Sequence, residues 1–192
     1  QNLFHVMSID QIQSEAKDKM DKTEQVVLRE FAGVRTGKAS PGLVENLQVE
    51  AYGSHMRLRE MAGITAPEPR LLVIQPWDAG TLHAIEKGIQ KANLGLNPTI
   101  DGKVIRISFP ELSTERREEF TKVVKKMAED GRVAVRHVRR EAIEQLKKAG
   151  KAGGVTEDEE KHAEKEVQKL HDKYVGHIDE HLGHKESEIM TV

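Results

Sequence analysis

The stretch "STERREEFTKVVKKMAEDGRVAVRHVRREAIEQLKKAG", residues 113–150, decides the fold of this chain. Its apolar side chains recur every three or four residues, which is the period of an α-helix with one buried face. The breaker Pro110 precedes the stretch, and Gly150 is a typical helix end. The sequence therefore predicts one long helix with a single buried stripe, formed by Phe120, Val124, Met127, Val135, Val138, Ala142, Leu146 and Ala149.

Two further segments have the same period. One opens with Ser8 followed by Gln11, and the other with Thr156 followed by Glu159, so both begin with a capping-box pattern. We expect the first to stop near Thr36. Three helices with one apolar stripe each can bury those stripes only against one another, which predicts a three-helix bundle. The predicted helical ranges are 8–36, 113–149 and 156–189.

The segment between the first two helices has a different character. The runs "NLQVEAY", "RLLVIQP" and "VIRISF" resemble strands, and "TLHAIEKGIQKA" reads as one amphipathic helix. We predict that residues 38–109 form a small α+β domain inserted into a bundle built from 7–37 and 110–192. The chain would cross between the two domains at Gly37–Lys38 and Pro110–Glu111, and two such short connections favour hinge motion.

Four arginines lie on one flank of the long helix. With Val135 at zero and 100° per residue, they fall between roughly 40° and 140°, beside a buried stripe centred near roughly −30°. Arg139 lies nearest the buried edge. The guanidinium fork suits phosphate oxygens better than the point charge of lysine. The four residues are Arg132, Arg136, Arg139 and Arg140.

Acidic residues of the same helix should leave these arginines free. Asp130 and Glu141 fall at roughly −140° and −120°, and we therefore expect no nearby acid within the arginine arc. Residues 113–154 carry 12 Lys and Arg against 7 Asp and Glu, net +5, whereas 155–192 carry 5 against 11, net −6. The pattern predicts a site for an outside polyanion.

Composition narrows the class of protein. The chain has 192 residues and no cysteine, which excludes disulfides and thiolate zinc sites. It has no apolar run long enough to cross a membrane and no leader pattern, so we expect a cytoplasmic protein without membrane contact. Aromatic residues make up only 4%, which favours recognition of a folded nucleic-acid backbone over stacking of single-stranded bases.

Three ordered blocks carry a family resemblance: "VRTGKASPGLVENLQVEAYG", "LGLNPTIDGKVIRISFPEL" and "RVAVRHVRREA". Together they resemble the bacterial ribosome recycling factor over about residues 7–192. The resemblance implies an L-shaped α+β protein, a monomer that is not an enzyme and needs no cofactor or metal. It also implies work with elongation factor G, splitting the ribosome after termination. Nucleotide chemistry would belong to that partner, since this chain has no "GxxxxGK[ST]" loop.

The resemblance also implies which residues contact ribosomal RNA of the large subunit. Arg139 matches the basic position most closely tied to that contact, and Arg136 matches a neighbouring one. Arg132, Arg117 and Arg35 are added from their proximity in the sequence or the motif. Guanidinium contacts to an RNA duplex would read its shape more than its base sequence.

The sequence departs from the family pattern in four places. His137 stands where asparagine is usual, Ala51 interrupts an aromatic pair, and Lys38 replaces a common arginine. Residues 1–6, "QNLFHV", precede Met7, which matches the family start. We interpret them as a cloning remnant or an extension and leave them out of fold reasoning.

Two alternatives remain open from the residues alone. "HIDEH", residues 177–181, matches the H-x-x-E-H order of inverted zinc peptidases, with His177 and His181 as ligands, Glu180 as base and His184 on the same face. We favour solvated helix histidines, because the bundle core accounts for Ile178 and Leu182. A plain helical scaffold, with arginines paired to the acidic third helix, is the other alternative, although exposed pairs contribute only about 0–1 kcal/mol each.

Overall fold

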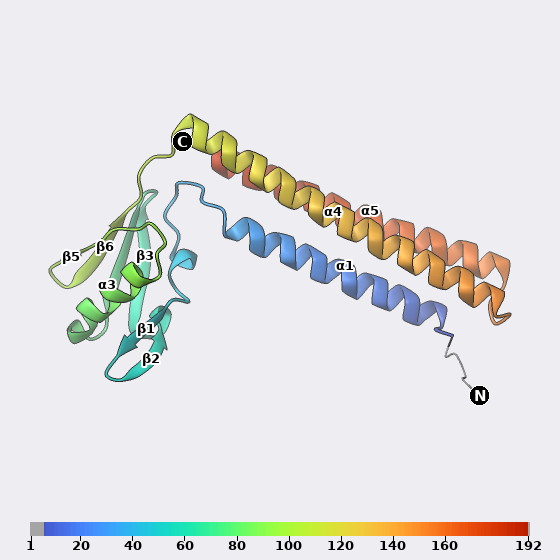
Figure 1. The fold of residues 1–192 in the computed structure, drawn as a ribbon, viewed down its shortest axis with the longest axis horizontal. Helices are drawn as coiled ribbons and strands as arrows, with labels where there is room; N and C mark the ends of the chain where they lie inside the picture. Colours follow the sequence, from blue (N-terminus) through green and yellow to red (C-terminus); the bar gives the residue numbers. More distant parts are fainter. Residues whose placement is uncertain (1–5, 192) are drawn as a thin grey trace. The chain divides into compact units, whose positions relative to one another are not determined.

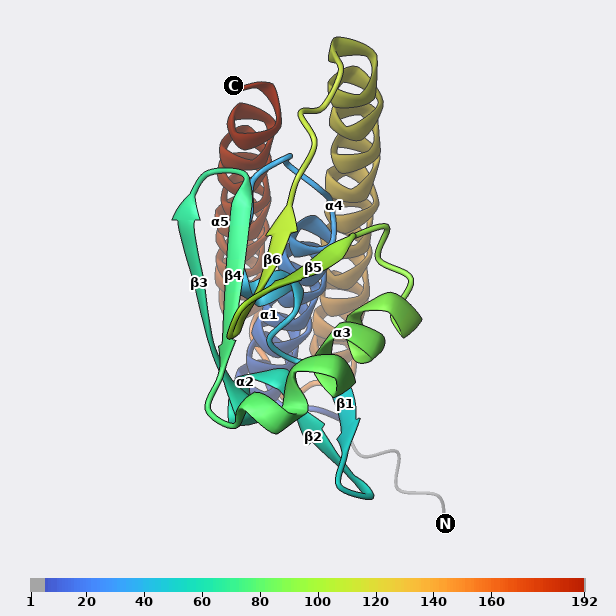
Figure 2. The ribbon, with the colours of Figure 1, turned by 90° about the vertical axis from the view of Figure 1, so that its left-hand side faces the viewer.

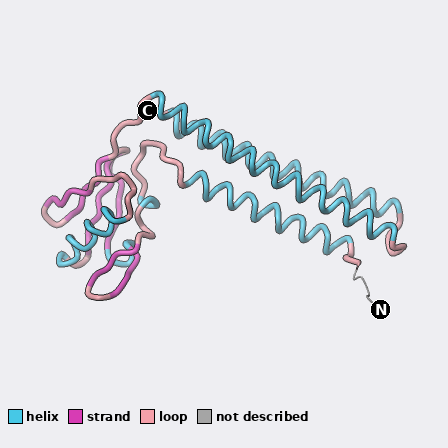
Figure 3. The backbone as a smooth tube through the Cα atoms, in the orientation of Figure 1, coloured by secondary structure: helices cyan, strands magenta, loops and turns pink. Residues whose placement is uncertain are grey.

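The chain forms two compact units in a computed structural model that describes residues 6–191. One unit runs from the N-terminus to Val34 and from Arg117 to the C-terminus, and the other covers Arg35–Arg116. The first is built from helices, and the strands lie in the second (Figure 3). Within residues 6–191, no helix is long and apolar enough to span a membrane.

The helical unit is a three-helix bundle, as predicted. Helices α1 (Ile9–Ala32), α4 (Thr114–Lys151) and α5 (Glu157–Met190) run side by side along their lengths (Figures 1 and 2). Each contributes its apolar stripe to one shared core. Fully buried members include Ile12 and Met20 of α1, Val124, Val135 and Leu146 of α4, and Val167, Tyr174 and Ile178 of α5.

Both predicted capping boxes are present. Ser8 Oγ accepts from the backbone N–H of Gln11 at 3.2 Å, and Gln11 Oε1 accepts from that of Ser8 at 3.0 Å. Thr156 and Glu159 cap α5 in the same way. The predicted end of α1 is wrong by about one turn. The helix stops at Ala32, where the N–H of Gly33 caps the last carbonyls.

Gly131 sets how closely α4 approaches its neighbours. A Cβ at this position would lie 2.5 Å from Val27 Cγ2 of α1 and 3.4 Å from Ile178 Cδ1 of α5. Any side chain here would push the helices apart, because the core is packed too densely to absorb an extra methyl group. The glycine therefore fixes the middle of α4 within the bundle.

The second unit is a small α+β fold. A four-stranded antiparallel sheet has the order β3-β4-β6-β5, and β1 pairs with β2 in a separate hairpin (Figure 2). Ile85 and Ile89 of α3 are buried with Ile105 and Ile107 of β6 in a core distinct from that of the bundle. The elements are β1 (Gln48–Ala51), β2 (Ser54–Arg57), α2 (Leu58–Met61), β3 (Ala62–Glu68), β4 (Leu71–Pro76), α3 (Leu82–Lys91), β5 (Pro98–Asp101) and β6 (Val104–Ser108).

Three strands of this unit were not predicted from the sequence. The predicted runs coincide with β1, β4 and β6, and the predicted helix with α3, whereas β2, β3 and β5 were not expected. The β1–β2 turn is made by Tyr52 and Gly53 at φ of 51° and 77°. Tyrosine is uncommon in that backbone region, so the turn gives no clear signal in the sequence.

Candidate RNA-binding surface

The α4 arginine surface consists of Arg132, Arg136, Arg139 and Arg140. Arg140 is exposed and the other three are half-buried, as their position beside the buried stripe predicts. Long arginine side chains can lay their stems on such an edge and keep the guanidinium near solvent. The four arginines therefore lie where an outside anion can reach them.

The prediction that no nearby acid lies within the arginine arc is wrong. Glu129 falls at about 120° on the same helical projection, and its carboxylate accepts from Arg132 Nη1 at 2.9 Å and from Arg136 Nη1 at 3.1 Å. These hydrogen bonds, from Arg132 first and Arg136 second, hold the pKa of Glu129 below its usual value. Two of the four arginines thus share one acid of their own helix.

An acid of the third helix also pairs with this surface. Arg132 Nε donates to Asp179 Oδ1 of α5 at 2.7 Å, and only 20% of the Arg132 side chain is exposed. This is the intramolecular pairing that a scaffold role would use. Arg132 is paired in this way, whereas Arg139 and Arg140 form no ion pair among residues 6–191.

Arg139 is held by a neutral group. Its Nη1 donates to Gln168 Oε1 of α5 at 3.3 Å. No carboxylate of residues 6–191 forms an ion pair with it, and its Nε is buried without a hydrogen-bond partner there. The charge of Arg139 is therefore not cancelled by a direct partner, although its side chain is partly fixed.

Arg117 does not join this surface, and Arg35 is not a residue of the bundle. Arg117 is 8% exposed, and its Nη1 donates to the backbone carbonyl of Ile189 at 3.1 Å, so it faces the end of α5. Arg35 belongs to the other unit, where its guanidinium packs over Gly95. Burial explains why proximity in sequence was a poor guide for Arg117.

The predicted hinge residues lie on the Arg35–Arg116 side of the unit boundaries. Gly37, at φ 78°, packs against Leu112, so the two connections lie beside each other. Glu111 accepts from Arg70 Nη1 at 3.5 Å. The residues next to Lys38 and Pro110 are tied to the β3–β4 turn, since Ala39 donates to the carbonyl of Pro69 and Phe109 to that of Arg70.

The "HIDEH" histidines make an interhelical contact. His177 Nδ1 lies 3.2 Å and His181 Nε2 3.1 Å from the carboxylate of Glu24 on α1. The expectation of solvated helix histidines is therefore wrong in part, because both contact Glu24 while 39% of the His177 and 31% of the His181 side chain stays exposed. Glu180, the base in the peptidase alternative, is exposed, and no group of three His, Asp or Glu within residues 6–191 is arranged to hold a metal.

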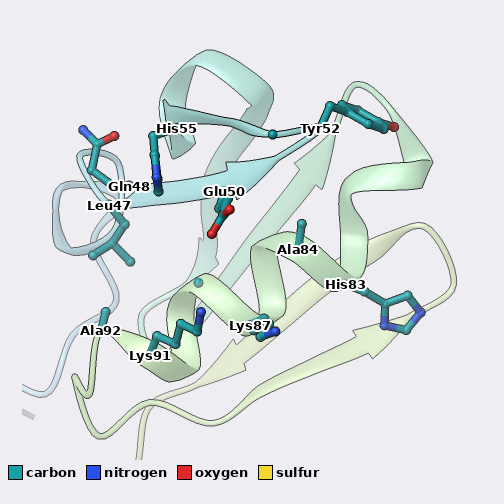
Figure 4. A pocket seen from close by; sticks show the side chains of 12 residues that line it. Leu47, Gln48, Glu50, Tyr52, His55, His83, Ala84, Lys87, Lys91 and Ala92 are labelled. Atoms are coloured by element: carbon teal, nitrogen blue, oxygen red, sulfur yellow. The ribbon is translucent and has the colours of Figure 1, made fainter.

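A groove of about 760 Å³ lies in the second unit between the β1–β2 hairpin and α3 (Figure 4). Its wall is mixed in charge, with Glu50 and His55 from the hairpin and His83, Lys87 and Lys91 from α3. Tyr52 stands at its edge, 79% exposed, and its hydroxyl donates to Asp78 at 2.7 Å. That hydrogen bond raises the pKa of Tyr52 and lowers that of Asp78.

Comparisons with known proteins agree with this fold. The family model described as "Ribosome recycling factor" matches residues 27–190. The ribosome-recycling factor of Caldicellulosiruptor saccharolyticus is 53% identical over 92% of this chain and 96% of its own length. That of Carboxydothermus hydrogenoformans is 50% identical over 96% of this chain and its whole length.

Solved structures give the same result. A solution structure of a ribosome recycling factor aligns with a TM-score of 0.82 and 42% identity, over 97% of this chain and all of that one. A second match is the T. thermophilus recycling factor, placed with E. coli elongation factor G on the E. coli post-termination complex. It has a TM-score of 0.67 and 43% identity, over 96% of this chain and all of that one. In sequence and in fold, this chain belongs to the ribosome recycling factor family.

Proposed function

We propose that this chain acts in the cytoplasm on ribosomes that have finished translation. With elongation factor G, it splits them into subunits and frees mRNA and tRNA. Its relatives support this role, because curated ribosome-recycling factors share about half of its residues over almost their whole length. The T. thermophilus factor placed with elongation factor G on a post-termination complex supports the choice of partner.

In this proposal the α4 arginine surface binds RNA of the large subunit, with Arg139 at its centre. The observation that carries this assignment is the hydrogen bond of Arg139 to the neutral Gln168, with no ion pair to a carboxylate among residues 6–191. A guanidinium without a direct acidic partner can exchange water for phosphate oxygens without first breaking an ion pair. Arg140 shares this advantage.

The other arginines of the surface have smaller roles. Among residues 6–191, Arg136 is held by Glu129 alone, through one hydrogen bond, and its side chain is 40% exposed. We place it as a second phosphate contact. Arg132 is bonded to both Glu129 and Asp179, so an RNA phosphate would compete with two carboxylates for it.

The inserted unit would move relative to the bundle during splitting. We place the hinge around Gly37, Lys38, Pro110 and Glu111, where two single connections carry the chain between units. Ala39 and Phe109 are fixed to the inserted unit by hydrogen bonds to the β3–β4 turn. This supports bending of the chain between these two residues and the bundle. We assign no catalytic step to this chain, since GTP hydrolysis belongs to elongation factor G.

The experiment is ribosome splitting with purified components. Post-termination ribosomes are mixed with this chain, elongation factor G from a closely related bacterium and GTP, and light scattering follows dissociation. We expect splitting only when all three are present, and binding of the chain to ribosomes that weakens as salt is raised. No splitting by a folded chain, together with no salt-sensitive cosedimentation, would overturn the proposal.

A further inference from the structure

Arg139 contacts a network of side chains on α5 that the RNA-binding assignment does not use. Gln168 accepts from Arg139 Nη1 through Oε1 at 3.3 Å. Its Nε2 donates to Asp172 Oδ1 at 2.9 Å, one helical turn further along α5. The amide of Gln168 thus bridges the cation of α4 and an anion of α5.

The network fixes which way the Gln168 amide points. An ionised carboxylate can only accept hydrogen bonds, so the NH₂ group must face Asp172 and the oxygen must face Arg139. His171 Nδ1 lies 2.9 Å from the same Asp172 oxygen and 3.3 Å from Gln168 Nε2. Hydrogen bonds from His171 and then Gln168 lower the pKa of Asp172, and the positive charge of Arg139 contributes in the same direction, so Asp172 is ionised at neutral pH.

Gln168 accepts a hydrogen bond from Arg139 but carries no charge of its own. It restricts the guanidinium without forming an ion pair with it, although Asp172 beside Gln168 attracts Arg139 electrostatically. Glu129, by contrast, pairs directly with both Arg132 and Arg136 and offsets part of their charge. Within residues 6–191, Gln168 is the one side chain that accepts a hydrogen bond from Arg139, and Arg139 Nε is buried without a partner there. Holding a side chain in place before binding removes part of its ordering cost.

We propose that Gln168 is a positioning residue, which orients the Arg139 guanidinium for its RNA phosphate contact without forming an ion pair with it. The inference rests on the proposed function of the α4 arginine surface. Gln168 acts through Arg139 and need not touch RNA itself. Its effect on ribosome binding should therefore vanish when Arg139 is removed.

A double-mutant cycle tests this in the full chain. Gln168→Met keeps side-chain length and helix propensity but removes the acceptor, and it is combined with Arg139→Ala. Gln145→Met is the matched control, because Gln145 is a half-buried glutamine of α4 with no side-chain hydrogen bond among residues 6–191. Binding to large ribosomal subunits is measured at several salt concentrations, beside thermal melting of each variant.

We expect Gln168→Met to weaken binding by about 3- to 10-fold in the parent chain and by less than about 2-fold in the Arg139→Ala background. Gln145→Met should leave binding unchanged. Gln168→Glu keeps an acceptor for Arg139 but removes the donor to Asp172, and its carboxylate should pair with Arg139, so this variant should lower the salt slope as Arg139→Ala does. If Gln168 had only a structural role, its substitution would lower the melting temperature but leave the salt slope of ribosome binding unchanged.

The outcomes separate the two proposals. If Arg139→Ala binds as well as the parent chain, the proposed function of this surface fails. If Arg139→Ala weakens binding but Gln168→Met has no effect, or has an equal effect in both backgrounds, the surface stands and the positioning role of Gln168 is overturned.

Discussion

Arg132 of α4 donates from Nε to Asp179 Oδ1 of α5 at 2.7 Å, and this pair ties one arginine of the surface to the acidic helix. The same contact lowers the charge that Arg132 can offer to RNA. The arginines of this surface therefore fall into two groups. Arg132 forms an ion pair between helices, whereas Arg139 has no direct acidic partner among residues 6–191.

Breaking that pair should release Arg132. We expect Asp179→Asn to strengthen binding to large ribosomal subunits at low salt by about 2- to 5-fold and to cost at most about 1 kcal/mol of stability. Glu180→Gln is the control, because it removes the same charge from the neighbouring residue without freeing an arginine. Equal gains in both variants would mean that overall charge, and not Arg132, is responsible.

Arg117 and Arg140 should behave in opposite ways. Arg117→Ala leaves the Ile189 carbonyl without its donor at the end of α5, so we expect it to lower the free energy of unfolding by about 1–3 kcal/mol. The affinity of the folded protein should not change. Arg140→Ala should weaken ribosome binding and leave urea melts unchanged. A binding defect in Arg117→Ala at full stability would restore Arg117 to the RNA contact.

The two histidines beside Glu24 should matter for stability. Replacing both His177 and His181 with alanine leaves a carboxylate whose side chain is 17% exposed without these partners, at a cost of about 1–2 kcal/mol. Splitting below the melting temperature should continue, with or without a zinc chelator. A chelator-sensitive hydrolytic activity that the double variant loses would favour the peptidase alternative.

Tyr174 predicts an alkaline limit to bundle stability. Burial, and then the hydrogen bond from its hydroxyl to Asp21, raise its pKa to about 12. A pKa raised on folding gives stability that is complete below the unfolded value of about 10 and is lost as pH rises toward 12. Thermal melts from pH 9 to 12 should therefore fall less steeply for Tyr174→Phe than for the parent chain. Parallel curves would exclude this coupling.

The sequence predicted the features of the fold that depend on local patterns, namely the helix starts and the apolar stripes. Helix starts at Ser8 and Thr156 follow from hydrogen bonds within one turn, and the three apolar stripes predicted a common core. The end of α1 could have been predicted from Gly33, since glycine is a typical helix end and caps this helix. The strand β3 was harder, because the Pro-containing run 62–68 has a weak local preference for a strand.

The site was predicted only in part, for two different reasons. Asp179, Gln168 and Glu24 reach their partners across helices, and spacing along one helix cannot reveal such contacts. Glu129 is different, since its angle could have been worked out from the same projection that placed the arginines. Arg117 was assigned from sequence proximity, whereas its burial depends on where the end of α5 lies.

Contact between Arg139 and RNA phosphate can be measured through the affinity of Arg139→Ala for large ribosomal subunits across a series of salt concentrations. We predict a loss of roughly 1–3 kcal/mol and a salt slope smaller by about 1, with unchanged melting. Arg139→Lys should recover only part of the affinity, since lysine lacks the planar fork. Unchanged affinity and slope in Arg139→Ala, or a loss that a lower melting temperature explains, would contradict the assignment.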